Sequence, residues 1–239
     1  MDRDDGWWFG EGARQAAMGP AWIVGLSLVS VGGLAHDVGV GLWIAGLSTL
    51  IVWAGPGQLI YFASIASGAA PIAILAATTL AGVRFVPMVV SLLPRVRGER
   101  TGAAAQILAS HFIAVTVWVE MMRRAPEAPR ERRMAFFFGF STGCIVIATA
   151  LTMVGFELSR LLPPALAAAL LFVSPIYFTC ALMRGAREGM DWIALGLGLA
   201  LAPVMNRWIG GGLDLLVTGL VGGTLAYVWR VGARMRSAA

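Results

Sequence analysis

The sequence predicts an all-α polytopic membrane protein. Of its 239 residues, 58% are hydrophobic and 13% are charged, and the mean hydropathy is +0.78. A soluble domain carries about 25% charged residues. The apolar residues here form runs of about 20, the length of a membrane-spanning helix, instead of the alternating patterns of a soluble fold. This composition excludes a soluble globular enzyme, a disordered protein and a nucleic-acid-binding domain.

Eight apolar segments are candidates for membrane spans. They are 18–35, 38–66, 69–93, 102–122, 134–156, 161–183, 192–204 and 213–229. Eight spans of about 20 residues use about 160 residues, which leaves short connections and no room for a soluble domain. The chain is therefore predicted to be a single membrane domain over 1–239, with a first half at 18–122 and a second half at 134–229.

The arginines predict the orientation of the chain. All 18 basic residues are arginine, and most lie between or beyond the apolar segments, where positive charge marks the cytoplasmic side. Loop 123–133 holds five and tail 230–239 holds three, so both are predicted to be cytoplasmic, as is the N-terminus. Segment 1–17 has aromatic residues followed by charges and is predicted to form a short interfacial helix.

One loop conflicts with strict alternation of the spans. Arg95, Arg97 and Arg100 precede segment 102–122, and eight full crossings would place these arginines outside. Either segment 102–122 does not cross fully, or an earlier segment is re-entrant. Seven and eight spans are therefore both compatible with the charges.

Two of the segments contain helix breakers. Segment 38–66 would be about 43 Å long as one straight helix, against a hydrocarbon core of about 30 Å, and its interior reads Ala-Gly-Pro-Gly-Gln at 54–58. Ser174-Pro175 interrupts segment 161–183. Proline removes a backbone donor and glycine lowers helix stability. Both helices are therefore predicted to break near the middle of the membrane.

The residues that follow the two breaks are similar, which indicates an internal repeat. Pro-Gly-Gln-Leu-Ile-Tyr-Phe at 56–62 corresponds to Pro-Ile-Tyr-Phe at 175–178. Broken helices at matching places in two halves point to the binding site of a transporter. The residues predicted to line that site are Pro56, Gly57, Gln58, Tyr61, Pro175 and Tyr177.

Two ionisable residues lie at membrane depth. Arg84 is near the middle of segment 69–93, where an unpaired arginine costs at least about 2.5 kcal/mol. It is predicted to face the interior, either as an anchor for an anionic group such as a carboxylate or as a structural residue bound by carbonyls at the breaks. His111 is central in segment 102–122 and is a candidate for proton coupling. The alternative is a neutral histidine bound to a neighbouring carbonyl or hydroxyl.

The sequence contains no cluster of metal ligands, no phosphate-binding loop and no cofactor motif, so neither a metal nor a cofactor is predicted. Residues 139–143 match the G-x-S-x-G pattern of a nucleophilic serine, but that pattern needs a strand-turn-helix context and lies here within an apolar helix. No catalytic residue is predicted. Gly139 and Gly143, like Gly219 and Gly223, have the spacing that lets membrane helices pack closely.

Residues 53–58, Trp-Ala-Gly-Pro-Gly-Gln, resemble the A-G-x-x-Q signature of the AzlC-type branched-chain amino acid permeases. About 25 residues later that family has an Asn-x-Arg element on a helix that ends in proline. Here Gly82-Val83-Arg84 runs on to Pro94, with Gly82 in place of the asparagine. Ser110-His111 stands where the family commonly has an acidic pair.

The resemblance implies the large subunit of a two-part exporter in the bacterial inner membrane, working with a small membrane partner of the AzlD type. The expected function is then secondary transport that exports branched-chain or other hydrophobic amino acids. From the residues alone, two other classes stay open. A membrane-embedded enzyme is suggested by residues 139–143 and His111, and a non-transporting scaffold subunit by the glycine spacing and the short loops.

Overall fold

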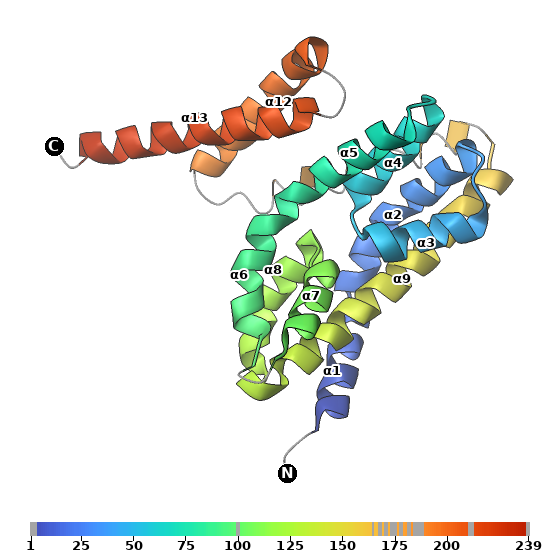
Figure 1. Cartoon of the computed structure of the whole chain (residues 1–239), viewed down its shortest axis with the longest axis vertical. Helices are drawn as coiled ribbons and strands as arrows, with labels where there is room; N and C mark the ends of the chain where they lie inside the picture. Colours follow the sequence, from blue (N-terminus) through green and yellow to red (C-terminus); the bar gives the residue numbers. More distant parts are fainter. Residues whose placement is uncertain are drawn as a thin grey trace.

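The computed structural model describes residues 4–98, 101–163, 189–209 and 213–237, together with eight positions between 164 and 188. All elements of this part are helices (Figure 1). In chain order they are α1 (Asp5–Ala17), α2 (Pro20–Asp37), α3 (Leu42–Val52), α4 (Gly55–Ala66), α5 (Pro71–Gly82), η1 (Val83–Phe85), α6 (Val86–Val96), α7 (Ala103–Phe112), α8 (Val115–Arg124), η2 (Ala125–Glu127), η3 (Arg130–Arg132), α9 (Arg133–Leu161), α12 (Gly189–Trp208) and α13 (Leu213–Ser237).

Within this part of the chain, three helices are long and apolar enough to cross a membrane: Pro71–Val96, Arg130–Leu161 and Gly189–Trp208. Two bent pairs bring the number to five if each pair is one span: α1 with α2, bent by 56°, and α7 with α8 (extended to Glu127), bent by 117°. The all-helical membrane class predicted from composition is therefore confirmed. The described residues support three to five spans, and the predicted number of about eight is not confirmed.

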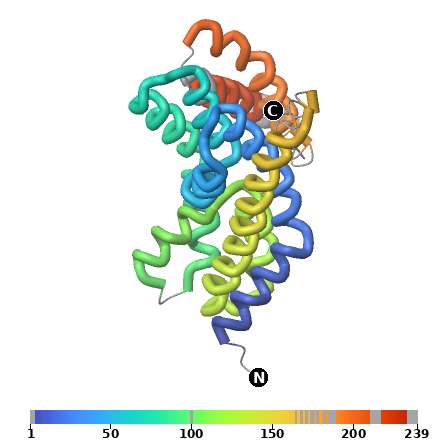
Figure 2. The backbone as a smooth tube through the Cα atoms, turned by 90° about the vertical axis from the view of Figure 1, so that its right-hand side faces the viewer, coloured from blue at the N-terminus to red at the C-terminus, as the bar shows by residue number. Residues whose placement is uncertain are grey.

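Helix α9 is the central element of the described fold. Figures 1 and 2 show α1 and α2 lying along it from end to end. The contact is close because glycines face backbone on both sides. A Cβ atom at Gly12 of α1 would collide with the Phe136 carbonyl, and one at Gly139 of α9 would collide with the Phe9 carbonyl. Lipid gives helices no hydrophobic reason to associate, so this close backbone packing is what holds them together.

The glycine spacing in α9 has the packing role that the sequence predicted. Gly139 lies on Phe9, and a Cβ at Gly143 would stand 2.9 Å from the Cβ of Ala16. Among the described residues, no atom lies within 4 Å of a Cβ built at Gly219 or Gly223 in α13, so the packing role of these two glycines stays a prediction. Helix α13 packs on α12 instead through Gly222, whose Cβ position is 3.7 Å from Leu197.

The predicted break in segment 38–66 is present, but it lies just before the Gly-Pro-Gly stretch. Helix α3 ends at Val52, and α4 already begins at Gly55, with Trp53 and Ala54 between them. Proline fits the first turn of a helix, where its missing N–H has no partner to lose. Residues 55–58 thus start the second half-helix, and the chain turns at Trp53, which adopts a left-handed conformation with φ 42°.

Segment 102–122 contains a break that the sequence did not predict. Helix α7 ends at Phe112 and α8 begins at Val115, and Ile113 and Ala114 carry the 117° bend between them. A chain that turns this sharply enters and leaves at the same end of the molecule. The first of the two topologies considered above, in which 102–122 does not cross fully, agrees with this geometry.

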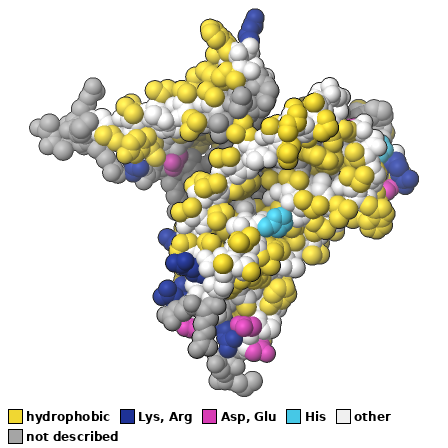
Figure 3. Space-filling view, in the orientation of Figure 1, with side chains coloured by type: hydrophobic (Ala, Val, Ile, Leu, Met, Phe, Trp, Pro, Cys, Tyr) yellow, Lys and Arg dark blue, Asp and Glu magenta, His cyan; other side chains and the backbone are white. Residues whose placement is uncertain are grey.

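The two arginine-rich loops lie together, as such a turn requires. The Arg133 guanidinium donates to the Arg95 carbonyl at 3.3 Å, and a Cβ at Gly98 would be 3.7 Å from Cα of Glu131. Arg132 also forms an ion pair with Asp5 of α1 at 2.9 Å. We call this end, with Asp5, 95–98 and 130–133, the charged end; Figure 3 shows charged side chains gathered there below a mostly hydrophobic face.

Helices α12 and α13 form a hairpin that touches the rest of the described fold mainly through α5 (Figure 1). The apolar stretch of α12 has no buried residue, and only 6% of the apolar stretch within Pro71–Val96 is buried. Such unburied apolar surface is expected of helices that face lipid. Ser174-Pro175, the predicted break of segment 161–183, lies outside the described residues, so the internal repeat stays a prediction.

Candidate functional site

The candidate site lies where the two breaks meet; we call residues 53–54 and 113–114 the paired breaks. The indole Nε1 of Trp53 donates to the Phe112 carbonyl at 3.2 Å. Close by, Nε2 of His111 and the Leu50 carbonyl lie 2.9 Å apart. These two contacts join the end of α3 to the end of α7, and each of the two ends contributes one side chain and one carbonyl. The structure thus brings together two interruptions that are about 60 residues apart in the sequence.

Each break leaves backbone groups without partners inside the helices. The last carbonyls of α3 and α7 and the first N–H groups of α4 and α8 have no helical partner. The same ends carry partial charges, negative at the carbonyls and positive at the N–H groups. A membrane accepts such unsatisfied backbone only where it lines a cavity or is buried in protein. The paired breaks therefore place donors and acceptors of opposite charge side by side.

Gln58 lies beside this site, in the first turn of α4, and its side chain is fully buried. Its Nε2 donates to Ser48 Oγ at 3.0 Å and to Thr49 Oγ1 at 2.9 Å, both in α3. Thr49 Oγ1 is in turn 2.9 Å from Thr152 Oγ1 in α9. A buried polar network therefore joins both half-helices of the break to the central helix.

Within the described structure, Oε1 of Gln58 has no hydrogen-bond partner. The sequence predicted a functional role for Gln58 from its place after the break, but not the hydroxyl groups that hold it. Ser48, Thr49 and Thr152 gave no signal, because serine and threonine are common in apolar membrane helices. Their role appears when α3, α4 and α9 are packed together.

The other residues predicted to line the site in the first half all lie in α4. Pro56 and Gly57 occupy its first turn; a Cβ at Gly57 would be 3.3 Å from the Cβ of Ala54, so the break is tightly packed there. Tyr61, one turn on, lines an apolar pocket of about 280 Å³ between α4 and α5. The pocket residues are Tyr61, Ile65, Pro71, Ile74, Leu75 and Thr78.

Arg84 lies in η1, halfway along the 26-residue helix Pro71–Val96. Its side chain is exposed, and its guanidinium carbon is 5.1 Å from the centre of the Phe85 ring. The sequence predicted that Arg84 faces the interior; the structure places it on an exposed face of the described fold. No hydrogen bond or ion pair joins it to another described residue.

His111 is exposed and lies at the end of α7. Its contact with the Leu50 carbonyl is the kind that the alternative prediction named, a histidine bound to a neighbouring carbonyl. If Nε2 carries the proton in that contact, Nδ1 is the nitrogen left to take up another.

The acidic residue of α8 is already paired. Glu120 in α8 accepts from Arg124 at 2.8 Å and lies 3.9 Å from Arg123. Pro175 and Tyr177, predicted for the second half of the site, lie outside the described residues.

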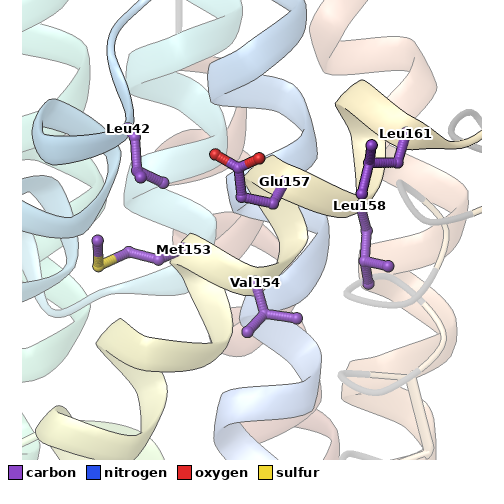
Figure 4. Close-up of a pocket in the computed structure, with 6 residues that line it drawn as sticks. All are labelled: Leu42, Met153, Val154, Glu157, Leu158 and Leu161. Carbon is purple, nitrogen blue, oxygen red and sulfur yellow. The ribbon is translucent and has the colours of Figure 1, made fainter.

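A second pocket, of about 300 Å³, lies between the start of α3 and the last turns of α9 (Figure 4). Its walls are the aliphatic side chains of Leu42, Met153, Val154, Leu158 and Leu161. Its one carboxylate, Glu157, pairs with Arg160 at 2.7 Å. This pocket offers no free polar group for a ligand, so the paired breaks are the better candidate.

The comparisons with known proteins agree with the predicted resemblance. The family model described as AzlC protein matches residues 9–162, which run from within α1 to the end of α9 and include both of the paired breaks. No curated protein and no solved structure matches the chain.

Proposed function

The chain belongs to the AzlC family, and from this premise we propose that it is a secondary transporter that exports branched-chain or other hydrophobic amino acids. The family is associated with branched-chain amino acid transport and works with a small partner subunit. We extend both properties to this chain, with a small AzlD-type membrane subunit as the partner and the bacterial inner membrane as the location.

The observation that carries the proposal is the contact between the two breaks, made by Trp53 with the Phe112 carbonyl and His111 with the Leu50 carbonyl. Half-helix ends that meet within the membrane are the usual binding site of secondary transporters. An amino acid zwitterion carries one positive and one negative group a few ångströms apart. The carbonyl ends of α3 and α7 suit the ammonium, and the N–H ends of α4 and α8 suit the carboxylate.

The apolar side chain of the substrate needs an apolar surface next to these polar ends. Tyr61 and the pocket between α4 and α5 begin one helical turn after Gly57. We propose that Pro56, Gly57, Gln58 and Tyr61 line the path in the first half, and that Pro175 and Tyr177 line it in the second. A hydrophobic substrate is favoured because four of the six residues of that pocket are aliphatic.

Two charged groups complete the proposed mechanism. Arg84 binds the substrate carboxylate, because a guanidinium can hold a carboxylate with two parallel hydrogen bonds and no described acid neutralises it. His111 couples a proton to transport through its contact with the break in α3. The charged end, with its arginines, faces the cytoplasm, as do both termini.

Counterflow in proteoliposomes tests the proposal. Vesicles that contain the protein and unlabelled leucine should accumulate labelled leucine or valine, more strongly when the small partner subunit is present. Glutamate and lysine serve as control solutes, and protein-free vesicles as the blank. If no hydrophobic amino acid exchanges under any gradient, with or without the partner, the transport function is wrong and the scaffold alternative gains support.

A further inference from the structure

We propose that Oε1 of Gln58 is the acceptor that binds the ammonium group of the transported amino acid, an assignment that rests on the proposed transport function. The sequence and the family match indicate a site near Gln58 but not what it binds. The directions of the buried hydrogen bonds around it identify the chemistry.

The donor of each hydrogen bond can be assigned by starting at Thr152, the residue of the network that is farthest from Gln58 along the chain of contacts. The Thr152 hydroxyl donates to the Ala148 carbonyl at 3.0 Å, which uses its single proton. The contact of 2.9 Å between Thr152 Oγ1 and Thr49 Oγ1 must then take its proton from Thr49. The Thr49 oxygen has therefore only acceptor capacity left for Gln58.

The second branch leads to the same result. The Ser48 hydroxyl donates to the Ala45 carbonyl at 2.7 Å and so faces Gln58 as an acceptor. Two acceptors require the NH₂ group of the amide, and both of its protons are used, at 3.0 Å and 2.9 Å. The orientation of the Gln58 amide is thus fixed by the hydroxyl groups, and Oε1 is the end that is left over.

This remaining oxygen is an acceptor without a donor. Gln58 has 0% of its surface exposed, and Oε1 has no partner among the described residues. A buried acceptor without a partner destabilises a fold. In both branches the amide NH₂ group donates to a hydroxyl group, and that hydroxyl group donates onward to another oxygen. These chains of hydrogen bonds polarise the Gln58 amide and make Oε1 more negative. The site is therefore suited to a cationic donor and repels a carboxylate.

The surroundings favour the same charge. Oε1 belongs to an amide held against Ser48 and Thr49, in the last turns of α3, where the helix carries its negative end. The Leu50 carbonyl there is occupied by His111. A primary ammonium satisfies Oε1 and still has two protons for the other carbonyls at the end of α3.

Three probes separate the two ends of the substrate: leucine, isocaproate, which is leucine without the ammonium group, and isoamylamine, which is leucine without the carboxylate. Affinities are measured from the thermal stabilisation of the purified full chain and from inhibition of counterflow. Gln58→Met should weaken leucine and isoamylamine by about 10-fold or more, the usual range for a lost hydrogen bond to a charged group. Isocaproate should bind with unchanged affinity.

Two variants serve as controls. Gln58→Glu keeps an acceptor oxygen at this position and should retain the preference for leucine over isocaproate. Ser27→Ala removes a buried hydroxyl that bonds to the Val24 carbonyl of its own helix, and should change none of the three affinities. If Gln58→Met does not fold, Thr49→Val loosens the amide from one side and should weaken leucine while sparing isocaproate.

Three results would overturn the assignment. An equal loss for all three probes makes Gln58 structural, and unchanged affinities place a water at Oε1. Stabilisation by sodium chloride over choline chloride that disappears in Gln58→Met assigns the site to a metal cation. The transport proposal fails separately: if leucine neither binds nor moves but isoamylamine binding depends on Gln58, the ammonium site stands without it. If leucine is transported but Gln58→Met leaves the ratio of the leucine affinity to the isocaproate affinity unchanged, the transport proposal stands and the ammonium site is wrong.

Discussion

Arg84 has little support from its described neighbours. It lies halfway along the helix Pro71–Val96 and touches the Phe85 ring, and no described carboxylate faces it. A cation over an aromatic face is worth about 0.5–2 kcal/mol, which does not offset the transfer of an arginine to mid-membrane depth. A ligand carboxylate would supply the missing interaction.

Arg84→Ala is therefore expected to abolish leucine counterflow while the protein still inserts and purifies normally. Arg84→Lys should weaken transport by a smaller factor, because lysine keeps the charge but loses the planar fork that binds a carboxylate with two bonds. Arg97→Ala, an exposed arginine at the charged end, is the matched control and should transport normally. Near-normal export by Arg84→Ala would make the arginine structural and move the carboxylate site elsewhere.

Trp53 connects the two breaks through one hydrogen bond and holds a left-handed conformation that costs about 1–2 kcal/mol for a residue with a Cβ. Trp53→Phe should keep the ring in place and remove the bond to the Phe112 carbonyl. We expect a loss of about 1 kcal/mol in stability, together with a clear change in the rate of leucine counterflow.

Trp118→Phe provides the comparison, since the Trp118 indole donates to Ser91 Oγ at 2.9 Å between α8 and α6. Both variants lose one indole hydrogen bond, so their melting temperatures should fall by similar amounts. Transport should change only in Trp53→Phe. Equal transport by the two variants would mean that the link between the breaks has no part in the mechanism.

At the scale of elements, the α1–α9 contact depends on glycine at defined positions. Gly12 and Gly10 lie in the same helix, but a Cβ at Gly12 would collide with the backbone of Phe136 and Phe140, and a Cβ at Gly10 meets nothing within 4 Å. Gly12→Ala should destabilise the protein by about 1–3 kcal/mol through overpacking. Gly10→Ala should leave stability unchanged or slightly higher. Thermal unfolding in detergent measures both, and equal melting temperatures would contradict the packing described for α1.

The two breaks differ in how visible they are in the sequence. The first break is indicated by Gly55, Pro56 and Gly57. The turn itself lies within two residues of Gly55, because proline is accepted in the first turn of α4. The second break is not visible in the sequence, since neither Ile113 nor Ala114 is a residue type that breaks a helix. The 117° bend is held instead by contacts from another helix, Trp53 to Phe112 and His111 to Leu50.

At the scale of the molecule, the charged end brings α1, the loop after α6 and the loop before α9 to one side. A disulfide tests this directly. In a chain whose Cys144 and Cys180 are replaced by serine, Gly98→Cys with Glu131→Cys should form an intramolecular disulfide on mild oxidation, because the Cβ position of Gly98 is 3.7 Å from Cα of Glu131. Gly98→Cys with Gly41→Cys, which lies at the start of α3, should not. Absence of the first disulfide would contradict the placement of both loops at one end.

The sequence by itself determined the membrane class, the helical content and the break in segment 38–66, and it selected Gln58, because composition, run length and glycine or proline act through the local chain. The conflict of Arg95, Arg97 and Arg100 with alternation was also visible, and it was the signal of a segment that turns back.

Tertiary structure decided which helices share the core, where the α7–α8 bend falls, and that Arg84 lies on an exposed face. It also decided which atom of Gln58 is left without a partner, since Thr152 is 94 residues away in the sequence and reaches the network only because α9 packs on α3. Hydrogen-bond direction and helix contact depend on groups far apart in the chain, and no local pattern records them.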